Sequence, residues 1–165
     1  MSNSIKNSLQ HIDRTVSALP NFIITDFPEL ASAGFMNVDR SGGARIPLGA
    51  MVGRSRVFEI DLDDIEVNSL QSGQGVPTAF DFQATLRVRY DAQGAGVKDE
   101  TKIQAAREQM ILTKALNGSN WGSVSGLVTL VASQGRISTG AAVDEAGSEF
   151  VFVLSEIAVD LSVDM

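Results

Sequence analysis

Residues 78–90 alternate between apolar and polar side chains with a period of two. The apolar positions are Phe80, Phe82, Ala84, Leu86, Val88 and Tyr90, and the positions between them are Asp81, Gln83, Thr85, Arg87 and Arg89. Successive side chains of a strand point to opposite faces of its sheet. The pattern therefore predicts a strand with one buried face and one solvated face, which is typical of an antiparallel sheet.

Three further segments have strand patterns. Phe58, Ile60 and Leu62 alternate with acidic residues, and a second apolar segment covers about residues 124–132. In the last segment, about 149–163, one face is apolar throughout: Val151, Val153, Ile157, Val159, Leu161 and Val163. The other face begins with Phe150, Phe152 and Leu154 and ends with Glu156, Asp160 and Asp164. We therefore expect the first half of this strand to be covered on both faces and its second half on one.

Two segments have helical periodicity. Over about residues 3–19, apolar side chains recur at spacings of three and four: Ile5, Leu9, Ile12, Val16 and Leu19. Such a stripe is the surface with which a helix packs, and Pro20 ends the helix. A second helix is predicted from about Asp99 to Asn117, followed by Gly118 as a C-terminal cap. Its stripe is Ile103, Ala106, Met110, Thr113 and Asn117, and Leu112 and Leu116 widen the apolar surface.

The order of these elements is helix, irregular segment, two strands, helix and two strands. This order predicts an α+β fold in which two helices pack on one face of an antiparallel sheet. A length of 165 residues suits a single domain spanning residues 1–165. Residues 31–56 have no sustained period and are expected to form a long irregular loop or arm.

The net charge of −7 is unevenly distributed along the chain. Residues 1–56 hold six basic and four acidic residues, a balance of +2, whereas residues 57–165 hold seven and sixteen, a balance of −9. An acidic surface repels phosphate backbones, so we do not expect nucleic-acid binding as the main function. We expect a protein that is made in the cytoplasm and stays soluble, because no signal peptide and no membrane-spanning apolar run is present.

The sequence predicts no enzyme, no cofactor and no metal site. There is no cysteine, and His11 is the only histidine, so thiol chemistry and most histidine-based sites are excluded. No Gly-x-Ser-x-Gly turn or phosphate-binding glycine motif is present. In the acidic run from Asp61 to Glu66, neither a turn glycine nor a glutamate stands at the position that a calcium loop requires. We interpret that run as a solvated strand edge.

The basic residues of the arm form the most informative group. Arg40, Arg45, Arg54 and Arg56 are interleaved with Ile46, Leu48 and Met51, and arginine among aliphatic residues is typical of an interface. We predict that this segment is ordered by a neighbouring subunit. Its arginines would then meet acidic residues of that neighbour, such as Glu59, Asp63 or Glu66, in a head-to-tail contact.

The acidic end of the last strand allows two interpretations. Glu156, Asp160 and Asp164 share one face, and no basic residue follows Arg136. In a ring through which DNA passes, these three carboxylates would line the lumen and repel phosphates. Alternatively, they belong to an outer solvated surface.

The arrangement resembles the tail terminator (neck) proteins of long-tailed bacteriophages. The resemblance lies in the helix Ser4–Leu19, the irregular basic extension, the strands around Val57–Leu62 and Phe80–Tyr90, the helix Asp99–Asn117 and the closing strands. It implies a virion protein: a hexameric ring that caps the tail tube, stops tube polymerisation and docks the head connector. Its partners would be its own copies, the tail tube protein and the connector, with DNA only as passing cargo.

Two other classes remain open at this point. One is another virion subunit, such as a tail tube or head-completion protein. The other is a small-molecule-binding β-barrel, which would need a closed sheet around an apolar lumen.

Overall fold

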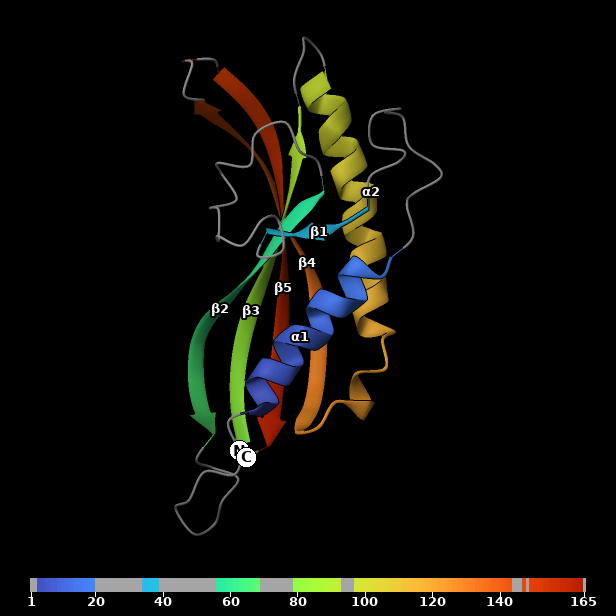
Figure 1. The fold of residues 1–165 in the computed structure, drawn as a ribbon, viewed down its shortest axis with the longest axis vertical. Coiled ribbons are helices and arrows are strands. Elements are labelled where there is room, and N and C mark those ends of the chain that lie inside the picture. Colours follow the sequence, from blue (N-terminus) through green and yellow to red (C-terminus); the bar gives the residue numbers. More distant parts are fainter. Residues whose placement is uncertain are drawn as a thin grey trace.

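The computed structural model describes residues 3–19, 34–38, 56–68, 79–92, 97–143, 147 and 149–164. The chain forms α1 (Asn3–Ser17), β1 (Met36–Asn37), β2 (Val57–Asn68), β3 (Ala79–Asp91), α2 (Val97–Asn117), the 3₁₀ helix η5 (Trp121–Ser123), β4 (Leu127–Val143) and β5 (Glu149–Asp164). The predicted α+β fold is confirmed (Figure 1). β1 and η5 are additions that the sequence pattern did not predict.

The five strands form one sheet in the order β1-β2-β3-β5-β4. β1 pairs with β2 in parallel, and the other three pairs are antiparallel. The last strand of the chain, β5, therefore lies between β3 and β4, and α2 connects those two strands across it. Because the pairs β2–β3, β3–β5 and β5–β4 are all antiparallel, β2 and β4 run in opposite directions.

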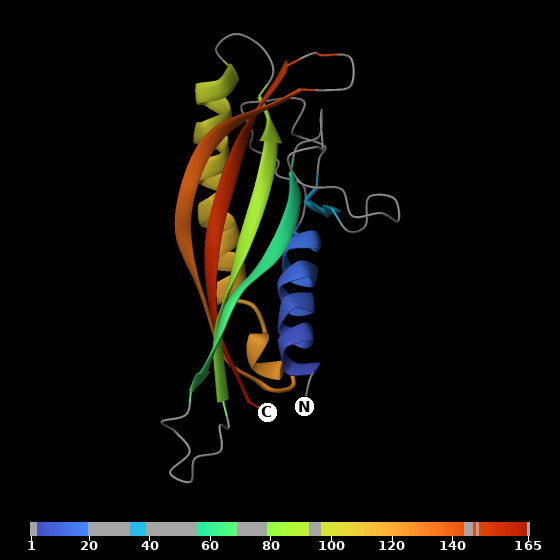
Figure 2. The same cartoon turned by 90° about the vertical axis from the view of Figure 1, so that its left-hand side faces the viewer.

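Both helices cover the same face of the sheet (Figure 2). The core between them takes the even-numbered positions of β3 and the odd-numbered positions of β5, as predicted; Leu86 and Ile157 are examples of fully buried side chains. α1 contributes Ile12 and Val16, which are also fully buried. Each such aliphatic side chain contributes about 1.5–3 kcal/mol by leaving water.

The predicted packing surface of α2 is right for Leu112 and Leu116, which are fully buried, and wrong for the stripe from Ile103 to Asn117. Ile103 and Met110 are 55% and 56% exposed, and Ala106 is exposed between them. The helix instead buries the opposite side, which comprises Thr101, Gln104, Ala105, Glu108, Gln109, Leu112 and Leu116. Four of these side chains are polar, and other elements supply hydrogen-bond partners to two of them: Tyr90 of β3 to Glu108 and Ser155 of β5 to Gln109. Hydrophobicity alone therefore identifies the wrong face.

A second small core lies on the other face of the sheet, at the beginning of β5. Val38 and Val57 are buried there, and Met36 and Leu154 pack against them. Next to it, the guanidinium of Arg89 stacks on the ring of Phe152 at 4.6 Å. The predicted double coverage of this half of β5 is therefore confirmed, but Arg89, expected on a solvated face, is fully buried.

Two strands are longer than predicted. β2 continues to Asn68, with an irregular register between Leu62 and Ile65. β4 was expected to end near residue 132 and extends to Val143, with register shifts between Leu127 and Thr129 and between Gln134 and Ile137.

Candidate functional site

The sheet face opposite the helices is polar and acidic beyond the small core, and we call this surface the open face. The strand register places side chains of β2, β3, β5 and β4 side by side on it. Its carboxylates are Glu59, Asp61, Asp63, Asp81, Glu156, Asp160 and Asp164, and its other side chains include Gln83, Thr85, Arg87, Thr129, Val131, Ser133 and Ser162. The open face thus concentrates negative charge from three strands.

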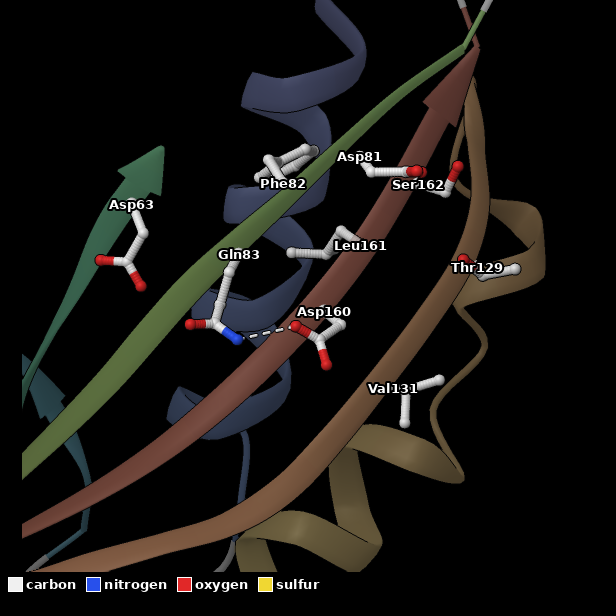
Figure 3. Close-up of a pocket in the computed structure, with 9 residues that line it drawn as sticks. All are labelled: Asp63, Asp81, Phe82, Gln83, Thr129, Val131, Asp160, Leu161 and Ser162. Carbon is white, nitrogen blue, oxygen red and sulfur yellow. Dashed lines mark hydrogen bonds between the residues drawn. The ribbon is translucent and has the colours of Figure 1, made fainter. Parts of the chain in front are cut away.

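A shallow hollow of about 500 Å³ lies on this face. Figure 3 looks onto it, with α1 behind the strands. Asp63, Asp81, Gln83 and Asp160 border it, and the amide of Gln83 donates a hydrogen bond of 2.8 Å to Asp160. The lining residues that the structure describes include no histidine, lysine or arginine. The hollow therefore offers carboxylates, the amide of Gln83 and the hydroxyls of Thr129 and Ser162, with no basic side chain among the described lining residues to activate those hydroxyls.

Arg87 of β3 is the basic centre of the open face. Its guanidinium forms an ion pair with Asp61 and lies 3.7 Å from Glu59 on β2 and 3.8 Å from Glu156 on β5. Beside it, the hydroxyl of Thr85 donates a hydrogen bond of 2.9 Å to Asp63. These partly exposed contacts join three strands but contribute little individually, about 0–1 kcal/mol each. Arg87 offsets only part of the surrounding negative charge.

The sheet has two long edges within the described residues, and they differ in charge. β4 lies at the end of the strand order and carries one charge along its length, Arg136. β1 pairs with only the first two residues of β2, Val57 and Phe58. The remainder of β2 carries five acidic residues and no basic one: Glu59, Asp61, Asp63, Asp64 and Glu66. We refer to these as the β4 edge and the β2 edge.

The predicted interface residues have different fates in the structure. Arg40, Arg45, Ile46, Leu48, Met51 and Arg54 lie outside the described residues. Glu59 and Asp63 lie on the open face, where each contacts a residue of β3 in its own chain. Glu66 pairs in register with Asp81, but its side chain lies outside the described part. The predicted lumen residues Glu156, Asp160 and Asp164 share the open face.

The prediction for Arg56 as an exposed interface residue is wrong. Its side chain is fully buried and bonded to Glu108 of α2, with Nε to Oε1 at 2.6 Å and Nη2 to Oε2 at 2.9 Å. The guanidinium also lies 5.9 Å from the ring centre of Phe35. A buried arginine needs such a bidentate partner because an unpaired charge in the core is costly.

Two more side chains complete the hydrogen bonding of Glu108. Gln104 donates to Oε2 at 2.8 Å, and the hydroxyl of Tyr90 donates to Oε1 at 3.3 Å. Burial, reinforced by the Glu108 carboxylate, raises the pKa of Tyr90 well above its usual value. The four side chains of this network are buried, so its hydrogen bonds hold α2 against β3 and the beginning of β2.

The single histidine also has a structural environment. Nε2 of His11 lies 2.8 Å from Oγ of Ser119, just after α2. Partial burial, with a smaller effect of Arg14, lowers the pKa of His11. Among the residues that the structure describes, no three His, Asp or Glu side chains are grouped to hold a metal ion.

None of the described helices is long and apolar enough to span a bilayer. No protein-family model matches the chain, and no curated protein matches it significantly.

Proposed function

We propose that the chain is a structural subunit of a bacteriophage tail or neck. Its copies form a ring that caps the tail tube, ends tube polymerisation and docks the head connector. The observation that carries the assembly is the complementarity of the β2 and β4 edges in charge and direction. The assignment to a tail rests on the resemblance in element order.

The β4 edge has the features of a strand that is paired in an assembly. Proteins that stay monomeric protect long edges with charged residues or proline. β4 has 17 residues, no proline and one charge, and Val128, Val131 and Val143 are exposed along it. At Ala132 the side chain of Asn117 already bonds the backbone N–H and C=O of β4, at 2.7 and 2.9 Å. A second strand would pair with the edge on either side of that point and cover these valines.

The β2 edge of another copy fits that role. β2 and β4 run in opposite directions in one chain, so a copy placed beside the first without being inverted brings the two edges together as an antiparallel pair. The acidic residues of β2 then approach Arg136 on an edge that carries no acid. The same contact repeats at each subunit, and a repeated head-to-tail contact closes into a ring when its rotation allows.

The arrangement of the two layers supports one orientation of the subunit in the proposed ring. Because the helices cover one face of the sheet, the open face is the one available to line a channel. Its carboxylates would repel DNA phosphates, so DNA would pass without being bound. This is the lumen interpretation of Glu156, Asp160 and Asp164.

A small-molecule-binding barrel has less support. In the described residues β4 does not close onto β1 or β2, and side chains of both helices fill the apolar face. A tail tube or head-completion subunit would use the same edges, so an assay of tube growth is needed to distinguish these subunits from a tail terminator. We expect the chain to stop growth when added to polymerising tube protein; a tube subunit would lengthen the tubes.

Charge variants of Ser133 test the contact directly. Ser133 is exposed on β4, so either charged side chain fits. Ser133→Glu should weaken ring formation by repelling the β2 acids, whereas Ser133→Lys should preserve or strengthen it. The difference should shrink at high salt, because ~1 M salt screens charges beyond about 3 Å. Light scattering and negative-stain imaging measure the outcome. Equal assembly of both variants, or a wild-type chain that stays monomeric alone and with tube protein, contradicts the proposal.

A further inference from the structure

The outer side of α2 carries an apolar seam that the core does not use. Ile103, Ala106 and Met110 follow one another at spacings of three and four. Thr113 continues their line, and Asn117 ends it, where its side chain bonds to the backbone of Ala132 in β4. Ile103 and Met110 are more than half exposed. This spacing is the one with which a helix packs lengthwise against another helix in a coiled coil. A helix side that only faced water would gain no stability from apolar side chains at this spacing.

We propose that this seam binds the same seam of a second copy of the chain, with the two α2 helices antiparallel. When the helices cross near Ala106, Ile103 of each copy lies beside Met110 of the other. The small side chain at the crossing point lets the two backbones approach closely. The apolar contacts are therefore self-complementary about a two-fold axis, as an isologous dimer requires.

The charges of α2 favour this direction. Asp99 and Glu100 lie in its first turn and Lys114 in its last, and Lys98 and Lys102 offset part of the charge at its beginning. An antiparallel pair places Glu100 of one copy near Lys114 of the other, at both ends of the contact. A parallel pair would place like charges together and would also align the two helix dipoles unfavourably.

This contact is independent of the proposed ring. It uses the outward side of the helix layer, whereas the ring contact uses the sheet edges. The seam contact relates two copies by a two-fold axis, whereas a head-to-tail contact has no such axis. A failure of either proposal therefore leaves the other standing.

Cysteine cross-linking tests both the contact and its direction, because the chain has no cysteine of its own. Ala106→Cys should form a disulfide-linked dimer under mild oxidation. Gly122→Cys is the matched control, since Gly122 is exposed on η5 with no atoms near the position of an added Cβ. Mixed Ile103→Cys and Met110→Cys chains should give heterodimers. Cross-linking of Ala106→Cys no faster than the control, or dominant Ile103→Cys homodimers, overturns the proposal.

Sedimentation of the uncross-linked protein supplies the second measurement. Ile103→Glu places a charge in the seam at a side chain that the fold leaves exposed, so its melting temperature should stay near that of the wild type. We expect the dimer dissociation constant to rise at least about tenfold. An unchanged dissociation constant, or the absence of dimer in the Ser133→Glu variant, whose seam is unaltered, overturns the proposal.

Discussion

Arg56 and Glu108 form a bidentate ion pair in the core, with Nε 2.6 Å from Oε1 and both side chains at 0% exposure. Arg56 has φ of 58° and precedes β2 directly. Its backbone N–H donates to the carbonyl of Arg89 at 2.7 Å, and its carbonyl accepts from Met36 at 3.0 Å. One residue thus connects β1, β3 and the middle of α2 at the beginning of β2.

Removing one charge of this pair should destabilise the protein strongly. Glu108→Gln keeps the side-chain shape but leaves the Arg56 guanidinium buried without a carboxylate, which costs about 3–5 kcal/mol. Glu149→Gln, at an exposed position at the beginning of β5, should change stability by less than about 0.5 kcal/mol. Urea unfolding of both variants measures the difference. Similar midpoints for the two would show that the pair carries little of the fold's stability.

Tyr90 should make the protein sensitive to alkaline pH. Burial and Glu108 raise the pKa of this phenol above its ordinary value of 10.0. The folded state therefore holds the proton more tightly than the unfolded state. This contribution is fully present below pH ~10 and is lost as the pH rises through the folded-state pKa.

The chain contains one tyrosine, so its phenolate absorbance reports this titration without overlap. We expect little phenolate in the folded protein at a pH where the unfolded protein is largely ionised. In Tyr90→Phe the fall in stability above pH ~10 should be smaller than in the wild type. Equal phenolate titration in folded and urea-unfolded protein would refute the prediction.

Gly135 should not tolerate a side chain. A Cβ at this position would overlap the carbonyl oxygen of Glu156 on β5, so the backbone would have to shift. We expect Gly135→Ala to lower stability by about 1–3 kcal/mol. Gly122→Ala is the control, because a Cβ there meets no atom within 4 Å. Thermal unfolding compares them, and a neutral Gly135→Ala would mean that the β4–β5 register adjusts freely.

The open face should be enclosed in the assembled ring. Asp160→Cys places a thiol there, and Gly122→Cys places one on η5. In the ring, a small maleimide should label both, whereas a maleimide attached to a large globular protein should label only position 122. Labelling of position 160 by the large reagent in intact rings would place this face on the outer wall.

The sequence was most informative where burial follows hydrophobicity. The alternation in β3 and β5 identified their core faces, because each strand presents one whole face to the helices. α2 was misread because Glu108 and Gln109 are buried against polar partners from other elements, and Gln104 is buried against Glu108. A hydrophobicity scale treats such side chains as solvated, and their hydrogen-bond partners cannot be inferred from the spacing of residues along the helix.

Long-range partners explain the other differences. Arg56 was grouped with the arginines near it in sequence, but the carboxylate that determines its position lies 52 residues further on. The second half of β4 was not predicted because it is polar and contains glycine. As an edge strand it needs few apolar residues, and its pairing with β5 supplies the hydrogen bonds.

The position of β5 has a consequence for synthesis on the ribosome. Every other strand is made before β5, yet β5 lies between β3 and β4 and pairs with both. Until β5 emerges from the ribosome, no strand lies between β3 and β4. The edges of these strands that would pair with β5 are then exposed to other nascent chains. The sheet is therefore completed in one late step that depends on non-local pairing, which is slow. Translation that stalls before residue 149 would leave a chain with helices and a hairpin but no continuous sheet.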